Sequence, residues 1–332
     1  MNGNRTVGPD VRPAPGVHRI EFPVDFPPEH VASYFLEGAE PILIDAAEAS
    51  PDHADRLERA LGSLGYDLAD VDHVVCTHPH VDHVGLVERL IEAGGPTVYA
   101  PATYRSGLER SSADRRADMV STGLEAGLPG PVAESVADWL AGKHQEIFDQ
   151  LPADAVDVWY DADDTVPVGD RRFETVHTPG HQRDHCCLLT EIDGERSLFS
   201  GDVAVSTFRP AAVHAGLTAE QSEAITAYYE TLDRLATRSV DRIYPGHGPV
   251  HDSLTGAIET ARESLDRLLA RTEDAVRPDG THAGHAADAR SGGSMDGPWL
   301  PEAIGALAHL ERRGRLESTL EDGVRRYRPA SD

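Results

Sequence analysis

Four potential metal ligands lie within six residues of one another: His78, His80, Asp82 and His83. They follow a hydrophobic stretch, residues 71–76, that is typical of a buried strand, and a helical pattern begins near His83. Alternation along an extended segment places His78 and His80 on one side, while Asp82 and His83 project from the following turn. Neutral imidazole and carboxylate are ligands that zinc prefers, at about 2.0–2.2 Å. The segment therefore predicts a zinc site in which two groups of donors face one cavity.

This segment resembles the H-x-H-x-D-H signature of the metallo-β-lactamase superfamily. Three later stretches resemble the further motifs of that family, in the same order: residues 178–181 (Thr-Pro-Gly-His), 200–202 (Ser-Gly-Asp) and 244–248 (Tyr-Pro-Gly-His-Gly). Each follows or ends a predicted strand, and the resemblance covers about residues 17–250. It implies an α+β fold, a four-layer αββα sandwich, and the activity of a metal-dependent hydrolase.

The resemblance also implies two zinc ions, each held by three side chains and joined by one shared carboxylate. The first three ligands would be His78, His80 and His181, the second three Asp82, His83 and His247, and the bridging carboxylate Asp202. A shared carboxylate and a shared hydroxide offset the repulsion between two close cations. Zinc is the favoured metal because all the zinc-type ligands are present, and iron and manganese remain alternatives.

Such a centre indicates hydrolysis. Metal binding lowers the pKa of water to about 7, so a hydroxide nucleophile exists at neutral pH. One metal would polarise the carbonyl or phosphoryl oxygen that the hydroxide attacks. Asp82 is the candidate catalytic residue, because its carboxylate can orient the hydroxide and accept its proton.

Three classes of reaction stay open. The Thr-Pro-Gly-His motif resembles that of glyoxalase II-like thioesterases and their lactonase and ester-hydrolase relatives, which favours a small thioester, ester or lactone as substrate. A winged-helix-like C-terminus resembles that of β-lactamase-like endoribonucleases, so a ribonuclease or nucleic-acid-acting protein is the alternative. Oxygen-dependent sulfur chemistry on a single iron, as in a sulfur dioxygenase, is the third.

Other polar residues near the motifs are not expected to bind metal themselves. Asp45 ends a strand and resembles a family position that supports the metal loops. Two alternatives stay open for His185. It either lies beside the metal ligands, where it supports them or contacts substrate, or it is a packed structural histidine. His177 is expected to be structural, and His282 and His285 to be solvated.

The elements that must position these residues divide the chain. Apolar segments separated by polar turns predict strands over much of residues 1–250, which would form the metallo-β-lactamase domain. Within it, residues 103–150 have a helical pattern and are expected to be an insertion near the active-site mouth. A connecting helix is expected over 251–275, a linker over 276–296 because of its Gly/Ala/His/Asp composition, and a winged-helix-like tail over 297–332.

The net charge of −27 is large, and only one of the 30 basic residues is a lysine. A strongly acidic, lysine-poor surface is what a protein in concentrated salt would carry, because screening removes most of the self-repulsion, so we expect a halophilic origin. The 297–332 segment alone is neutral, with six arginines and six acids. That balance would allow the tail to contact phosphate, but dimerisation or closure of the pocket is favoured.

The remaining expectations concern location and partners. No apolar run at the start could serve as a signal peptide, and no stretch approaches the roughly 18 apolar residues of a membrane span. A cytoplasmic protein that acts on a small molecule, without a membrane partner and with a homodimer left open, is expected. The three cysteines have no paired spacing and are expected to be buried free thiols.

Overall fold

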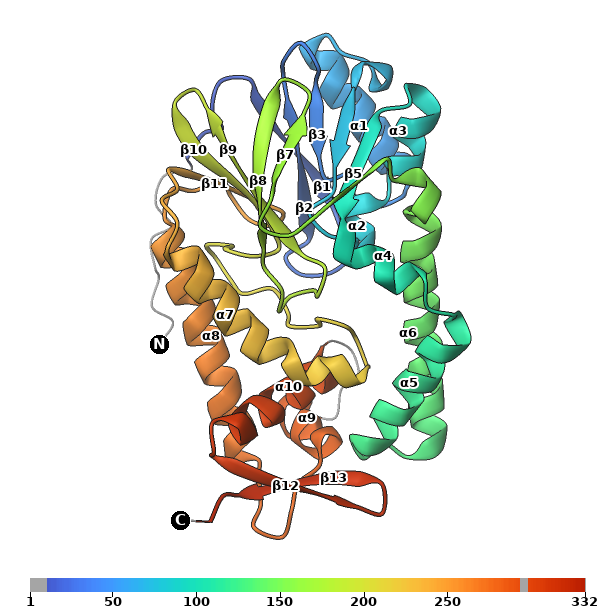
Figure 1. Ribbon diagram of the computed structural model, residues 1–332, viewed down its shortest axis with the longest axis vertical. Helices are drawn as coiled ribbons and strands as arrows, with labels where there is room; N and C mark the ends of the chain where they lie inside the picture. Colours follow the sequence, from blue (N-terminus) through green and yellow to red (C-terminus); the bar gives the residue numbers. More distant parts are fainter. Residues whose placement is uncertain (1–10, 293–297, 332) are drawn as a thin grey trace.

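Two β-sheets packed face to face form the centre of the molecule, in a computed structural model that describes residues 11–292 and 298–331 (Figure 1). In spatial order, the strands of the larger sheet are β1 (Val17–Pro23), β2 (His30–Leu36), β3 (Ile42–Ile44), β4 (His73–Val75), β5 (Thr97–Pro101) and β6 (Val158–Tyr160). Those of the smaller sheet are β11 (Arg242–Pro245), β10 (Glu195–Gly201), β9 (Cys186–Ile192), β8 (Arg171–His177) and β7 (Thr165–Val168). Strands over much of residues 1–250, which the sequence predicts, are confirmed.

The pairing of the strands brings several of their carboxyl ends to one edge. In the larger sheet β1, β2 and β3 pair antiparallel, and β3 to β6 pair parallel. In the smaller sheet β7 to β10 alternate in direction, whereas β10 and β11 are parallel. Strands β8, β10 and β11 therefore end on the same side, which allows the loops that follow them to meet.

Helices cover the outer face of each sheet, so the molecule has four layers. On the larger sheet these are α1 (Pro51–Leu64), α2 (Val81–Val84) and α3 (Val87–Ala93), and on the smaller sheet α7 (Ala224–Ala236) and α8 (Leu254–Asp274). Separate clusters of buried apolar side chains fill the space beneath the two helical layers and between the sheets, where Tyr34, Phe199 and Tyr244 meet. The expected αββα sandwich is confirmed.

The helix expected from His83 onward is interrupted. The N–H groups of Gly85 and Leu86 bond to the carbonyls of Ala47 and Ala46, at 2.8 Å each, instead of continuing a helical ladder. A Cβ at Gly85 would lie 2.0 Å from the Ala49 nitrogen, so only glycine allows the two backbones this close. The break leaves α2 as a single turn that is fixed to the loop after β3.

Residues 103–150 are helical, as expected, and lie between β5 and β6. Their helices are α4 (Ala102–Leu108), α5 (Ser112–Glu125) and α6 (Gly130–Gln150). Helices α5 and α6 run side by side along one flank of the molecule in Figure 1. Short 3-10 helices lie elsewhere in the chain: η1 (Leu68–Asp70), η2 (Ala153–Ala155) and η3 (Ala219–Glu223).

The expected linker over 276–296 is wrong for its centre, where helix α9 (Ala283–Ser291) forms. The His282 side chain caps this helix by accepting a hydrogen bond from the His285 N–H, and the Gly284 N–H donates to the Ala126 carbonyl at 2.7 Å. Neither histidine is fully solvated, because the small residues around them let α9 lie close to α5. The composition suggested a linker because these small side chains give no strongly hydrophobic pattern, although they allow close packing of helices. Residues 293–296 lie outside the described part of the chain.

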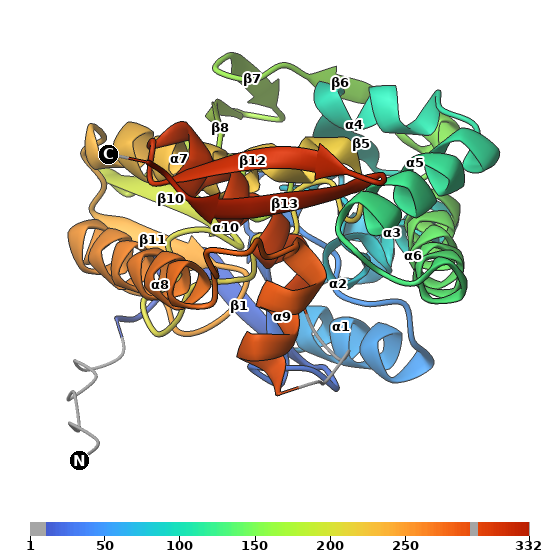
Figure 2. The same ribbon diagram turned by 90° about the horizontal axis from the view of Figure 1, so that it is seen from below.

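The C-terminal segment forms a helix and a hairpin: α10 (Trp299–Arg312), β12 (Leu316–Glu321) and β13 (Val324–Pro329). Helix α10 packs against α7, α8 and α9, and its buried Leu300, Ala303 and Leu307 share one apolar cluster with residues of α5 and α6. Figure 2 shows the hairpin crossing the base of the molecule toward α5. The winged-helix assignment stays a prediction.

Two further expectations concern the whole chain. Cys76, Cys186 and Cys187 are buried free thiols, as expected. In the parts that the structure describes, every helix is too short or too polar to cross a membrane.

Candidate metal centre

The seven side chains expected to bind metal come from the ends of four strands. His78 and His80 lie in the loop after β4, and Asp82 and His83 on the single turn of α2. The other three follow β8, β10 and β11, at His181, Asp202 and His247. Together they form two clusters of buried or nearly buried donors: His78, His80, His181 and Asp202 in one, and Asp82, His83 and His247 in the other.

The first cluster has the spacing of ligands around a small cation. His80 Nδ1 lies 3.1 Å from His78 Nε2 and 3.0 Å from His181 Nε2. Ligand atoms about 2.0–2.1 Å from a tetrahedral zinc would be about 3.3 Å apart, so the three nitrogens are already close to that arrangement. This imidazole triad fits one zinc ion.

Asp202 lies between the two clusters. Its Oδ1 is 3.2 Å from His83 Nε2, and its Oδ2 is 3.2 Å from His247 Nε2 and 3.3 Å from His181 Nε2. Asp82 Oδ2 completes the second cluster, 3.6 Å from His83 Nε2 and 3.4 Å from His247 Nε2. Asp202 thus contacts candidate ligands of both clusters, which is the position required of a carboxylate that bridges two metal ions.

Two buried atoms at this junction need a partner. His83 Nε2 and Asp202 Oδ1 are shielded from solvent and, although they lie 3.2 Å apart, form no hydrogen bond with each other or with another described residue. A buried polar atom without a partner costs about 1–3 kcal/mol, and a cation between them would remove that cost. The residues present therefore fit a metal ion.

The electrostatics of the two clusters differ. Burial, together with neighbouring imidazoles, lowers the pKa of His80 to about 3 and that of His78 well below its usual value, so both rings are neutral and can bind metal through a lone pair. Burial alone would also lower the pKa of His247, but Asp202 and Asp82 outweigh it and raise that pKa to about 10. The second cluster is thus rich in negative charge, which favours a cation there.

Asp45 holds the first motif in place. Its Oδ1 accepts a hydrogen bond from the Thr77 N–H at 2.7 Å, and its Oδ2 lies 2.8 Å from both the Thr77 hydroxyl and His83 Nδ1. With Nδ1 bonded to Asp45, the His83 ring directs Nε2 to the centre. Asp45 is 3% exposed and has a φ of 57°, an unusual conformation that the surrounding contacts must maintain. The support expected for this residue is found.

His185 positions Asp202 and belongs to neither cluster. Its Nε2 accepts a hydrogen bond from the Asp202 N–H at 3.0 Å, and its Nδ1 lies 2.7 Å from the Thr178 hydroxyl. Of the two alternatives for His185, the supporting one applies. His177 is structural, as expected, with Nε2 2.9 Å from the Arg183 carbonyl.

His30, which no sequence pattern singled out, fixes the last motif. The His30 carbonyl accepts a hydrogen bond from His247 Nδ1 at 2.6 Å, and the Gly248 N–H donates to His30 Nε2 at 2.8 Å. Because His30 lies at the start of β2 in the opposite sheet, His247 is oriented by a strand about two hundred residues away.

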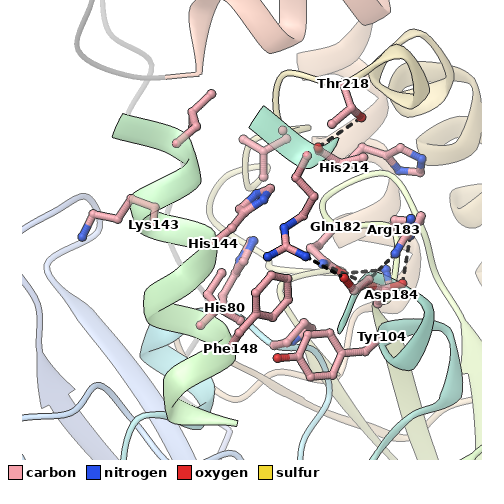
Figure 3. A pocket seen from close by; sticks show the side chains of 18 of the residues that line it. His80, Tyr104, Lys143, His144, Phe148, Gln182, Arg183, Asp184, His214 and Thr218 are labelled. Atoms are coloured by element: carbon pink, nitrogen blue, oxygen red, sulfur yellow. Dashed lines mark hydrogen bonds and ion pairs between the residues drawn. The ribbon is translucent and has the colours of Figure 1, made fainter. Parts of the chain in front are cut away.

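A cavity of about 300 Å³ opens beside the first cluster, with His80 in its wall. Figure 3 shows His144 and Phe148 of α6 on one side of it and Gln182 to Asp184 on the other, while Lys143 points away. A second, larger and mostly apolar hollow also includes His80 and His181 and extends along Trp139, Leu217 and Leu300. Residues of the helical 103–150 segment therefore line the cavity that contains His80.

The sequence matches the Metallo-beta-lactamase superfamily over residues 26–247, two thirds of the chain and all of the centre. The chain belongs to this superfamily. The whole-chain fold is also similar to that of a metallo-beta-lactamase family protein from Thermus thermophilus, with a TM-score of 0.72 and 23% identity over 95% of this chain and 99% of that one. A beta-lactamase domain protein from Burkholderia ambifaria has the same TM-score at 22% identity, over 97% and 95% of the two chains.

Curated relatives of this superfamily member are distant. The probable metallo-hydrolase YqjP of Bacillus subtilis is 24% identical over 72% of this chain and 74% of its own. A beta-lactamase-like protein 2 homolog of Caenorhabditis elegans and an atrochrysone carboxyl ACP thioesterase of Cryptosporiopsis are each 24% identical over 67% of this chain. Those two matches cover only 57% and 49% of the relatives' own lengths.

Proposed function

We propose that the protein is a dinuclear zinc hydrolase that cleaves a small thioester, ester or lactone. The observation that carries the proposal is the convergence of seven His and Asp side chains in two clusters, with Asp202 in contact with both. Zinc at this centre would supply a water activated near neutral pH and would polarise a carbonyl group.

The chain's own residues supply the rest of the chemistry. The Asp82 carboxylate, 6% exposed and held near His83 and His247, accepts the proton of the attacking water and orients it. The apolar hollow beside His80 and His181 excludes bulk water and accommodates an apolar part of the substrate. Apolar lining of this kind favours a small organic substrate, and one relative is named as a thioesterase.

The nucleic-acid alternative has less support. Five of the six arginines in the C-terminal segment pair with carboxylates of this chain. The pairs are Arg312 with Glu223, Arg315 with Glu273, Arg325 with Glu125, and Arg326 and Arg328 with Glu321. These pairs neutralise charge that phosphate binding would need.

Metal content and turnover test the proposal together. Elemental analysis of the purified protein should find about two zinc ions per chain, and a panel of thioesters, esters and lactones should include a substrate. His80→Ala should lose both metal and turnover, and Asp82→Asn should lose turnover, whereas His18→Ala, at the far end of β1, should retain both. One iron per chain with oxygen-dependent turnover would contradict the proposal in favour of sulfur chemistry.

The ribonuclease alternative needs a separate test, because deleting buried α10 would unfold the region it packs against. Arg313→Gln and Arg326→Gln change exposed or half-buried charge and leave α10 in place. RNA cleavage that these variants weaken, without turnover in the ester panel, would replace the proposed function.

A further inference from the structure

Arg115, on helix α5, is a buried cation in the wall of the 300 Å³ cavity that also contains His80. Arg115 is only 9% exposed to solvent, which is unusual for arginine. The guanidinium carbon lies 4.3 Å from the centre of the Phe148 ring, so an aromatic face covers one side of it. The cation is therefore held in a fixed orientation beside the centre.

The neighbours of Arg115 leave its charge uncompensated. Its Nη1 donates hydrogen bonds to the carbonyls of Gly107 and Arg110, and the described part of the chain places no carboxylate within 4.0 Å of it. Neutral carbonyls satisfy donors but supply no counter-charge. Burying an unpaired charge is costly, so a residue held in this way points to an anion that is supplied from outside the chain.

The other charged groups of the cavity wall are already paired. Arg183 binds both acids of the wall, with Asp184 at 3.0 Å and Glu220 at 3.0 Å. Arg110 lies 3.2 Å from Asp118, and Lys143 lies 2.9 Å from Glu146 and points away from the cavity (Figure 3). His144 adds no further positive charge, because burial and Arg115 lower its pKa to about 4 and keep the ring neutral.

The ionisation of Arg115 agrees with this geometry. Burial, and next the repulsion of Arg110, lower its pKa from the usual value, although guanidinium pKa values are so high that the group stays charged at neutral pH. A bound anion would oppose both effects. In a protein with a net charge of −27, a positive cavity is a local exception, and it would concentrate anionic ligands beside His80.

We propose that Arg115 binds a carboxylate or phosphate group of the substrate, so that the substrate is a small ester or thioester with an anionic group at the end remote from the scissile bond. This inference rests on the proposed hydrolase function. The Arg115 guanidinium binds the oxyanion through its unoccupied N–H groups, and the scissile carbonyl lies toward His80. A cavity of about 300 Å³ is at the small end of ligand pockets, which limits the remote group to a few carbon atoms.

A purely structural role for Arg115 is the competing explanation, because its two carbonyl partners lie at and just beyond the end of α4. That role predicts lower thermal stability in any Arg115 variant and equal effects on all substrates. Anion binding predicts an effect that depends on the charge of the substrate. The two explanations therefore differ in a readout that folding alone does not change.

The test uses matched substrates with the zinc-loaded protein. A thioester of glutaric acid that keeps its free carboxylate is compared with its neutral methyl ester and with an analogue that carries a phosphate. Arg115→Gln should lower kcat/KM about 10- to 100-fold for the anionic substrates, mainly through KM, and less than about threefold for the neutral one. Arg115→Lys should fall between, because lysine keeps the charge but loses the planar fork. Preference for carboxylate or phosphate identifies the anionic group.

Arg116→Gln is the matched control, since it removes the same charge from the neighbouring position of α5, where Arg116 pairs with Asp138 on the surface. It should leave all three substrates unaffected. Equal losses for neutral and anionic substrates in Arg115→Gln, or no loss for either, would overturn the inference.

A binding measurement separates this inference from the proposed function. Calorimetric titration with glutaramic acid, which has one carboxylate and one amide, is compared with titration of neutral glutaramide. If no ester or thioester is hydrolysed but Arg115→Gln weakens glutaramic acid binding at least tenfold relative to Arg116→Gln, the anion site stands and the hydrolase proposal fails. Equal binding by both variants overturns the anion site, whatever the outcome of the turnover panel.

Discussion

Glu302, on helix α10, accepts a 2.6 Å hydrogen bond from Arg209, and Arg290 donates to its other oxygen at 2.9 Å. The Ala212 N–H also donates to Glu302, at 3.2 Å. Ala211 lies between Arg209 and Ala212 in the sequence, and its carbonyl is 2.8 Å from His181 Nδ1. The C-terminal helix therefore fixes the loop that orients one of the candidate metal ligands.

Replacing Glu302 tests this link. Glu302→Gln leaves two buried arginines without a counter-charge, and breaking a buried ion pair costs about 3–5 kcal/mol. We expect a clear fall in the free energy of unfolding, measured with urea, and lower zinc affinity because His181 loses its support. Glu317→Gln, an exposed change on β12, is the control and should alter neither quantity.

Glu302 also makes stability depend on pH. Burial raises its pKa, but Arg209 and Arg290 outweigh burial and hold the pKa below its usual value. A carboxyl with a lowered folded-state pKa contributes stability above its unfolded pKa of about 4.3, and that contribution is lost as the pH falls through the folded value. Unfolding at pH 7 and at pH 3–4 should therefore differ less in Glu302→Gln than in the wild type. An unchanged pH dependence would show that Glu302 does not contribute.

Asp45→Asn should weaken metal binding without removing a candidate ligand. The amide cannot replace all the hydrogen bonds that the carboxylate accepts from Thr77 and His83, so the His83 ring is less well oriented. Loss of such a supporting group costs about 10- to 100-fold in metal affinity, which competition with a chromophoric chelator would measure. Asp55→Asn, on the exposed face of α1, should bind zinc like the wild type, and equal affinities for all three proteins would exclude the role given to Asp45.

Gly246→Ala should disturb the centre directly. A Cβ there would lie 2.7 Å from Asp202 Oδ1 and 2.7 Å from His83 Cε1, so the carboxylate between the two clusters has to move. We expect less than one zinc ion retained per chain after dialysis and a loss of turnover. Gly142→Ala, on α6 with open space around it, is the control and should be neutral or stabilise by about 0.5–1 kcal/mol. Full zinc retention in Gly246→Ala would show that the centre tolerates this shift.

The motif that carries four of the seven donors could be predicted from the sequence because its spacing is local: two imidazoles alternate on an extended segment and the next donors begin a turn. The roles of His30 and Arg115 could not be predicted. The role of His30 depends on β2 lying opposite the loop after β11, and the unpaired charge of Arg115 depends on how α4, α5 and α6 pack. Helix α9 was missed because its buried face consists of alanine and glycine, whose contribution depends on close approach and not on hydrophobic pattern.

The halophilic expectation gives a further prediction. With a net charge of −27, the free energy of unfolding should rise as KCl increases from about 0.1 M to 1 M, over which the Debye length falls from about 10 Å to 3 Å. Each kcal/mol gained raises Tm by roughly 1–2 °C for a chain of 332 residues, because the entropy of unfolding grows with chain length. Sucrose at equal osmolarity is the control for non-ionic effects. A Tm that falls steadily with KCl would contradict the expectation.

Ten of the 22 residues that line the small cavity, Arg115 among them, belong to the segment inserted between β5 and β6, whereas the candidate metal ligands all come from outside that segment. In the hydrolase that we propose, substrate choice would therefore depend partly on a stretch of the chain that holds none of the residues for bond cleavage. Relatives could exchange the inserted stretch and acquire new substrates while the reaction stays the same, and directed evolution of selectivity should begin between residues 103 and 150.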